Sequence, residues 1–174
     1  MCMDSIQVDE LYRKYGKELY LYLYGLCRQR ELAEDILQDT LCKALFSLSD
    51  SHQNVRAWLY MVGRNLMLNE LKKRKREILS PENTVLPEPP AAADDWSLPE
   101  NTAIRKESME SLYKTLLSLD MRKRELLLLY YVDGFTLKEA ASIMGISHEN
   151  ARVLCSRAKK ELRKRLEVEH YEVS

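Results

Sequence analysis

A series of local folding signals between residues 136 and 165 constrains this chain more than any other part of its sequence. Thr136 predicts a helix N-cap, and Glu139, three residues later, completes a capping box. Gly145 predicts the left-handed residue that ends this helix, and Ser147 predicts the N-cap of a second helix after a short turn. Two helices joined by a short turn with a glycine are typical of a helix-turn-helix, whose second helix enters the DNA major groove.

The second of these helices carries different chemistry on its two sides. At about 100° per residue, small and apolar side chains gather on one side, and polar or charged side chains gather on the other. The outward side offers cations for phosphates and short polar groups for base edges; the alternative is an ordinary amphipathic surface helix. The inward set is Ala151, Leu154, Cys155, Ala158 and Leu162, and the outward set is Glu149, Val153, Ser156 and Lys160, flanked by Arg152, Arg157, Arg163 and Lys164.

The formal charges of the 174 residues balance to zero, but they are segregated along the chain. The net charge is −3 over residues 1–53, +6 over 54–76, −6 over 77–101 and +3 over 102–174. Two basic regions separated by an anionic one are typical of a protein that binds a polyanion. The chain has only five glycines and five prolines, which favours a helical architecture over strands and turns.

The composition changes sharply at residues 77–101, which hold all five prolines and six acidic residues but no basic ones. We therefore expect a flexible acidic linker at 79–101. It would join two small helical domains, 1–78 and 102–174, in an all-α protein. The linker would either keep the two basic domains apart or occupy a channel built for nucleic acid, and its composition does not distinguish these roles.

Residues 31–48 predict a helix with an unusual outer face. Its inner side is apolar, whereas its outer side combines an acidic row with an exposed aromatic residue. Such a face suits docking onto a basic protein partner, and a merely solvated acidic face is an equal alternative. The inner set is Ala33, Ile36, Leu37, Thr40, Ala44 and Leu48, and the outer set is Asp35, Gln38, Asp39, Cys42 and Phe46.

A third helix is expected from Asn54 onward, and it ends in the basic run at 72–76, KKRKR. Five consecutive cations exceed what a helix dipole needs, and cations beside aromatic and amide side chains favour single-stranded nucleic acid. The pattern places Asn65 and Asn69 near the edge of the buried side. It places Val55, Trp58, Leu59, Val62 and Leu66 inward, and Arg56, Tyr60, Arg64, Arg74 and Lys75 outward.

No motif predicts a catalytic residue, a metal site or a cofactor. Cys2, Cys27, Cys42 and Cys155 show no zinc-ligand spacing and are expected to be reduced thiols. The three histidines lie in unrelated contexts, and there is no Gly-rich phosphate loop. The longest apolar run, 19–26, is too short to cross a membrane, and no targeting signal is visible. We therefore expect a cytoplasmic protein without membrane insertion.

Nearly the whole chain resembles the extracytoplasmic-function (ECF) group of bacterial RNA polymerase sigma factors. Residues 32–40, LAEDILQDT, resemble the segment of that family that binds core polymerase. Residues 57–65, AWLYMVGRN, resemble its minus-ten recognition helix, and residues 120–165 resemble its minus-thirty-five-binding domain. The three motifs in this order, with an acidic linker between them, make the resemblance specific.

The resemblance implies partners and roles. It implies binding to bacterial RNA polymerase core, to promoter DNA as duplex and as melted non-template strand, and to an anti-sigma factor. The loop at 49–54 would receive a flipped base, and the linker would thread toward the RNA exit path. The implied core-binding residues are Asp35, Gln38 and Asp39, with Cys42 and Phe46 on the same face. The minus-ten set is Asn54, Arg56, Tyr60, Arg64, Asn65, Asn69, Lys72 and Lys75, and the minus-thirty-five set is Ser147, His148, Glu149, Arg152, Val153, Ser156, Arg157 and Lys160.

The chain also departs from the family pattern after Arg152. Many relatives continue with Ser-Arg, whereas this chain has Val153 and Leu154. The change removes one phosphate-binding cation and puts an apolar side chain where a thymine methyl group can sit, so the promoter sequence of a relative is not transferable. The alternative function is a free-standing helix-turn-helix regulator. It would need a self-dimerising surface, and the second basic element disfavours it.

Overall fold

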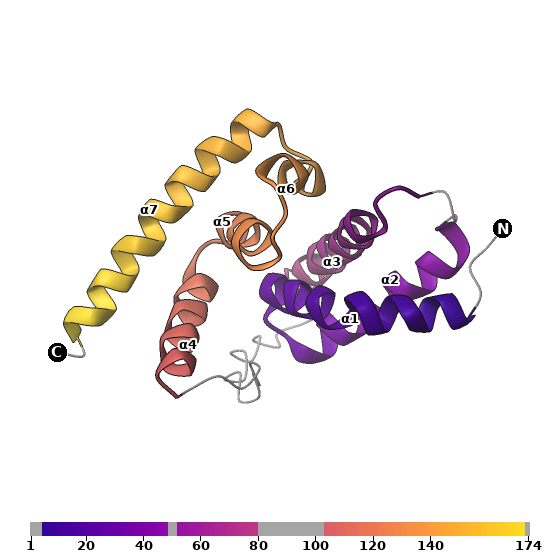
Figure 1. Ribbon diagram of the computed structural model, residues 1–174, viewed down its shortest axis with the longest axis horizontal. Helices are drawn as coiled ribbons and strands as arrows, with labels where there is room; N and C mark the ends of the chain where they lie inside the picture. Colours follow the sequence, from indigo (N-terminus) through magenta and orange to yellow (C-terminus); the bar gives the residue numbers. More distant parts are fainter. Residues whose placement is uncertain (1–4, 49–51, 80–102, 173–174) are drawn as a thin grey trace. The chain divides into compact units, whose positions relative to one another are not determined.

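The computed structural model describes residues 5–48, 52–79 and 103–172, and the chain divides into two compact units, residues 1–91 and 92–174 (Figure 1). All secondary structure in the described ranges is helical, which confirms the predicted all-α fold with two helical units. The expected linker lies outside the described residues from residue 80 onward, as does the loop segment 49–51. The domain limits drawn from the sequence therefore stay predictions.

The first unit consists of α1 (Ser5–Cys27), α2 (Arg30–Ser47) and α3 (Val55–Ile78), each packed against the other two. Apolar residues at spacings of three and four build its core, as the helical period requires. The predicted inner side of α2 is confirmed, because all six residues assigned to it are buried. The core includes Leu19, Tyr22, Leu23 and Leu26 of α1, Leu32, Ile36, Leu37, Leu41 and Ala44 of α2, and Leu59, Tyr60 and Met67 of α3.

A close approach at Gly63 sets how α3 lies against the other two helices. A Cβ atom added to Gly63 would stand 3.2 Å from Thr40 Oγ1 and 3.4 Å from Leu23 Cδ2. The buried hydroxyl of Thr40 donates a hydrogen bond to the carbonyl oxygen of Ile36 at 2.7 Å, so it needs no partner from α3. The absence of a side chain at Gly63 thus lets α3 meet α1 and α2 at short range and determines which residues of α3 face outward.

The second unit consists of α4 (Ala103–Ser118), α5 (Met121–Leu127), the π-helix η1 (Leu128–Val132), α6 (Leu137–Met144) and α7 (His148–Glu172). The leucine run at 126–129 is buried in the core of this unit. The sequence predicts one α-helix over 122–132, but α5 ends at Leu127. The hydrogen bonds that follow join residues farther apart in the sequence than in an α-helix. Asp133 N donates to Leu128 O at 2.9 Å, and Phe135 N donates to Leu129 O at 3.0 Å.

The helix-turn-helix forms as its local signals predict. Glu139 N donates to Thr136 Oγ1 at 3.1 Å, and Thr136 N donates to Glu139 Oε2 at 2.8 Å, which confirms the capping box. Gly145 adopts φ 65° in open space, so the turn requires glycine for its backbone conformation and not for room. Ser147 Oγ accepts a hydrogen bond from Asn150 N at 3.1 Å and caps α7. The buried face of α7 is centred on Ala151, Cys155 and Ala158, as the sequence predicts.

Candidate nucleic-acid and protein interfaces

The outer face of α2 is open to solvent along its length. Asp35, Gln38, Asp39 and Cys42 are all exposed, and Phe46 is 72% exposed. The opposite face of the same helix is buried in the core of the first unit. The predicted outward orientation of these five residues is therefore confirmed, and the face combines carboxylates, an amide and a large aromatic ring.

Tyr60 does not face outward, so its prediction as a DNA contact is wrong. Its side chain is fully buried, and its ring centroid lies 4.8 Å from that of Tyr22 in α1. The buried side of α3 is centred on Leu59, Tyr60, Gly63 and Met67, whereas Val55, Trp58, Val62 and Leu66 are only half-buried. The short contact at Gly63 turns this side of α3 toward α1 and α2 and brings Tyr60 inward with it.

Two arginines that the sequence places on the outer side of α3 are engaged within the first unit instead. Arg56 pairs with Glu18 of α1 through contacts of 2.7 and 3.1 Å, and its guanidinium lies 5.6 Å from the Tyr60 ring centroid. Arg74 pairs with Glu70 at 3.1 Å and donates to Gln29 Oε1 at 2.9 Å. Their assignment to the outer side is corrected, because both tie α3 to neighbouring residues and are half-buried. Arg64 is also half-buried.

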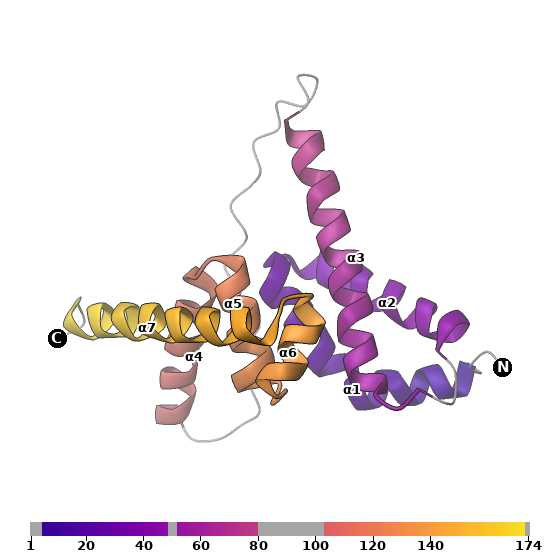
Figure 2. The same cartoon turned by 90° about the horizontal axis from the view of Figure 1, so that it is seen from above.

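The same rotation of α3 brings Asn65 and Asn69 to the middle of its exposed side and not to the edge of the buried side. Met61, Lys72 and Arg76 continue this line at helical spacing and are exposed too. We call these five residues the α3 stripe. The C-terminal part of α3, which carries Lys72 and Arg76, extends beyond α1 and α2 (Figure 2).

Sequence reasoning missed Met61 and Arg76 as members of this surface. Met61 lies four residues before Asn65 and Arg76 eleven residues after it. These spacings put both residues on the same side of a helix as Asn65, and they were the signal that could have identified them. Lys75 is exposed beside the stripe. Asn54 is exposed as well, but its side-chain oxygen accepts a hydrogen bond from Ala57 N at 3.0 Å and caps α3.

The N-terminal half of α7 presents its predicted reading residues to solvent. Ser147, His148, Glu149, Arg152, Val153, Ser156, Arg157 and Lys160 are all exposed. Glu149 and Arg152 approach to 3.6 Å, and a pair so exposed contributes little to stability. Neither Arg157 nor Lys160 forms an ion pair with any residue that the structure describes.

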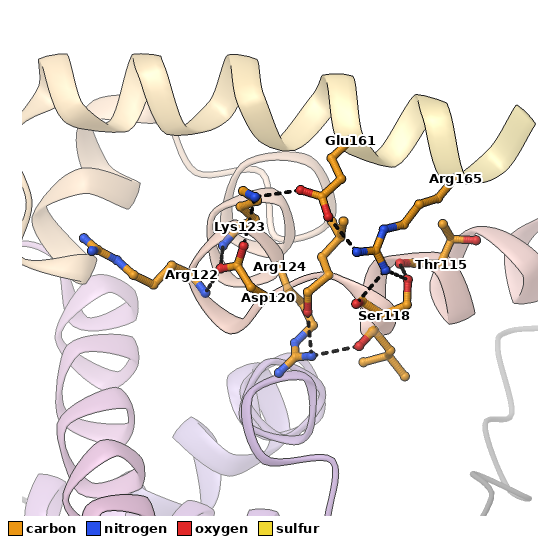
Figure 3. Close-up of polar contacts among 10 residues, drawn as sticks. Thr115, Ser118, Asp120, Arg122, Lys123, Arg124, Glu161 and Arg165 are labelled. Atoms are coloured by element: carbon orange, nitrogen blue, oxygen red, sulfur yellow. Dashed lines mark hydrogen bonds and ion pairs between the residues drawn. The ribbon is translucent and has the colours of Figure 1, made fainter. Parts of the chain in front are cut away.

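A cluster of charged and hydroxyl groups fixes α7 against α4 and α5 (Figure 3). Lys123 Nζ contacts Glu161 Oε2 at 2.6 Å and Asp120 Oδ2 at 3.1 Å. Arg165 contacts Glu161 Oε1 at 2.6 Å and donates to Ser118 O at 2.8 Å. The hydrogen bonds from Lys123 and then from Arg165 hold the pKa of Glu161 below its ordinary value. The cluster therefore orients α7.

Lys159 is also engaged inside the second unit. Its ammonium lies 5.6 Å from the ring centroid of Tyr131, and a hydrogen bond to that residue raises the pKa of Lys159. Lys159, Lys123 and Arg165 therefore serve the packing of α7. The other cations of α7 (Arg152, Arg157, Lys160, Arg163 and Lys164) are exposed.

Three further features bear on the kind of site that the chain offers. Among the residues that the structure describes, no group of three or more His, Cys, Asp or Glu side chains could hold a metal ion. Within those residues, Cys27, Cys42 and Cys155 form no disulfide. None of the described helices combines the length and the apolar character needed to cross a membrane.

Comparison with known proteins gives consistent matches. The family model for Sigma-70 region 2 matches residues 11–77, and the model for Sigma-70 region 4 matches residues 109–162. The ECF RNA polymerase sigma factor SigM of Bacillus subtilis is 30% identical over 157 residues, which cover 90% of this chain and 93% of SigM. The RNA polymerase sigma factor YlaC of the same organism is 28% identical and covers 91% of each chain.

Two solved structures share the fold. The sigma factor RpoE of Bartonella quintana, in complex with the anti-sigma factor NepR, has a TM-score of 0.73 at 24% identity and covers 91% of this chain and 98% of its own. CnrH, in complex with the cytosolic domain of CnrY, has a TM-score of 0.64 at 22% identity and covers 95% of this chain and 90% of its own.

The lowered pKa of Glu161 predicts an acid-sensitive docking of α7. A carboxyl whose folded pKa lies below its ordinary value of 4.5 contributes stability above that pH, and the contribution is lost as the pH falls through the lower, folded pKa. We expect hydrogen exchange of α5 and α7 in the full chain, corrected for intrinsic rates, to accelerate below about pH 4.5. Glu161→Gln should reduce this pH dependence and leave the part due to Asp120: against the effect of burial, the hydrogen bonds from Lys123 also lower the pKa of that residue. Glu167→Gln, a change at an exposed position on the same helix, should keep the whole of it. Identical profiles for Glu161→Gln and the parent chain would contradict the role of the cluster.

Proposed function

The chain belongs to the ECF group of RNA polymerase sigma factors, which recognise promoters and initiate transcription, and we propose how its two units divide this work. The outer face of α2 binds the polymerase core, the α3 stripe binds the melted non-template strand, and the N-terminal half of α7 reads duplex DNA. The observation that carries the proposal is the α3 stripe, an exposed line of amides and cations opposite a fully buried face. The chain is proposed to contribute recognition and strand separation, and no chemistry of its own.

Docking of α2 onto the polymerase core is favoured by the mixture of groups on its outer face. Asp35 and Asp39 lie about one turn apart and can pair with arginine or lysine side chains of a partner. Phe46, with 72% of its side chain exposed, offers an aromatic anchor beside them. Carboxylates for orientation next to an aromatic anchor are the combination that a protein partner uses, so we prefer docking to the solvated alternative.

Binding of the melted strand is supported by the order of groups along α3. Asn65 and Asn69 offer amides to the edges of unstacked bases, and Lys72 and Arg76 offer charge to the phosphates that follow. Lys75, beside the stripe, extends the charged part. Arg56 and Tyr60 are left out of the proposed contact set because both are engaged inside the first unit. The flipped-base role of the loop at 49–54 rests on the family resemblance.

Duplex binding by α7 is supported by the contrast between its two sides. His148 and Glu149 open the helix, where a recognition helix meets base edges. Arg152, Arg157 and Lys160 follow and can contact phosphates. Val153, half of whose surface is exposed, can meet a thymine methyl group in the major groove.

An anti-sigma factor is a further proposed partner. The related RpoE structure holds one, NepR. We propose that an inhibitor of this chain covers the outer face of α2, because a single partner there excludes the polymerase core. Action on polymerase places the protein in the cytoplasm, and we propose that location for it.

Reversal of one charge on α2 tests core binding. Asp35→Arg should abolish capture of core polymerase by the full chain, because it replaces an outward carboxylate with a cation facing a basic partner. Glu10→Arg is the matched control: it makes the same charge change at an exposed position of α1 and should leave capture intact. Circular dichroism should show unchanged helix content for both. Capture of core by Asp35→Arg at the parent level would remove α2 from the interface.

Salt dependence tests the α7 assignment. A promoter is first identified by transcription of fragmented host DNA with core polymerase and the parent chain. Lys160→Ala should then weaken binding of the polymerase holoenzyme to the duplex of that promoter. It should also flatten the plot of log affinity against log salt by about 0.9 for the lost phosphate contact. Lys114→Ala, at an exposed position of α4, removes the same charge and should leave the slope unchanged. A parental slope for Lys160→Ala would show that this side chain meets no phosphate.

The role of the amides is tested by separating opening from binding. Asn69→Ala should reduce promoter opening, followed by permanganate reactivity of unpaired thymines, more than it reduces affinity for the closed duplex. The reason is that its amide is proposed to meet bases only after they leave the stack. Equal losses in both assays would argue against a strand-specific contact.

A further inference from the structure

The two-residue turn between α1 and α2 contains a residue with a strained backbone. Arg28 has φ 57°, and among the residues that the structure describes it is the only one other than glycine with a positive φ. The two glycines of this kind, Gly134 and Gly145, belong to the second unit. A side chain in this left-handed region crowds the following carbonyl oxygen, whereas glycine adopts the region freely and is the usual residue just after a helix. The turn would therefore form more favourably with glycine at position 28.

No contact inside the first unit explains an arginine at this position. The Arg28 side chain is exposed and forms no ion pair or hydrogen bond with any residue that the structure describes. Its backbone N–H donates to Tyr24 O at 2.7 Å, a bond that any residue except proline can make. The neighbouring Arg30, by contrast, pairs with Glu34 at 3.2 Å. Backbone strain at a residue whose side chain has no partner in its own unit indicates a partner outside it.

Arg28 lies beside the cationic end of α3. Gln29, the next residue, accepts a hydrogen bond from Arg74 Nη1 at 2.9 Å, so the turn lies against α3 near residue 74. Arg74 is two residues away from each cation of the α3 stripe, and at about 100° per residue it stands about half a turn from them. Lys73 is exposed between these two sides. The cations of the first unit therefore lie on more than one side of α3.

A single strand that follows the α3 stripe cannot reach Arg28, because it presents one line of phosphates to one side of a helix about 10 Å across. Duplex DNA presents two lines of phosphates, separated by a major groove about 12 Å wide, so it can contact both sides of a helix at once. The five consecutive cations at 72–76 beside this turn favour a polyanion over an isolated carboxylate of a protein. The partner that fits Arg28 is therefore duplex DNA.

We propose that Arg28 binds a phosphate of the duplex next to the melted segment, on the strand that the α3 stripe does not hold. Lys73 extends this second contact toward the stripe. A charge-assisted hydrogen bond to phosphate offsets the cost of the left-handed backbone when DNA is bound. The inference rests on the proposed function of the α3 stripe, because the stripe must hold the non-template strand for the complementary strand to lie on the other side.

Replacement of Arg28 by glycine separates the strain from the charge. Arg28→Gly removes the cation and relieves the backbone, so the full chain should unfold at a temperature at least as high as the parent chain. With the polymerase holoenzyme and a promoter duplex that ends in a single-stranded non-template extension, the variant should flatten the plot of log affinity against log salt by about 0.9. On the single-stranded non-template oligonucleotide alone, it should bind like the parent chain.

Three further variants serve as references. Arg28→Lys keeps a cation at the turn and should retain the parental slope. Arg13→Ala removes the same charge at an exposed position of α1 and should leave binding to both DNA molecules unchanged. Lys72→Ala should weaken binding to both, because its proposed contact is with the strand that they share.

The outcomes distinguish this contact from other roles of Arg28. A parental slope for Arg28→Gly on the extended duplex would overturn the proposal. So would an equal change on the single strand, which would assign Arg28 to the strand held by the stripe, or weaker capture of core polymerase, which would assign it to an acidic protein surface. A lower unfolding temperature for Arg28→Gly would remove the strain on which the proposal depends. If instead Lys72→Ala binds the single strand like the parent chain, the proposed function of the stripe itself fails.

Discussion

The position of α3 depends on one contact, the short approach of Gly63 to Thr40 and Leu23. Since the glycine has no side chain, the helix can approach α1 and α2 closely at this point, and once it does, Tyr60 on one side and Met67 on the other must enter the core. The exposed side of α3 follows from this rotation, and with it the line from Met61 to Arg76. The proposed strand-binding surface is thus a consequence of how tightly the opposite face packs.

A different kind of interaction sets the orientation of α7. Its buried face is built from small residues, and small side chains alone leave a helix some freedom to rotate or slide on its neighbours. The contacts of Lys123, Glu161 and Arg165, together with the bond from Arg165 to Ser118, limit that freedom because they are short and directional. α7 is therefore held by its C-terminal half, and the outward residues of its N-terminal half are exposed.

In both units some cations are paired within the unit and others are exposed to solvent. In the first unit, Arg56 and Arg74 pair within the unit while Lys72, Lys75 and Arg76 remain exposed. The second unit repeats this division along α7, where Lys159 and Arg165 are engaged and Arg157 and Lys160 face solvent. The net charge of a segment therefore overstates the charge available to nucleic acid, because a paired cation must give up its partner before it can meet a phosphate.

Much of this protein was determined by its sequence alone. The all-α class, the capping box at Thr136 and Glu139, the left-handed turn at Gly145 and the outer face of α2 all followed from residues a few positions apart, and signals of that range act within one helix or one turn. The rotation of α3 was decided only by the tertiary structure. A helical wheel weighs Trp58 and Val62 at least as heavily as Tyr60 and Met67, and it cannot register that a residue without a side chain, Gly63, permits a short contact with α1 and α2. Arg56 looked like a DNA ligand for the same reason, because its partner Glu18 is distant in sequence and near only after α1 and α3 have packed.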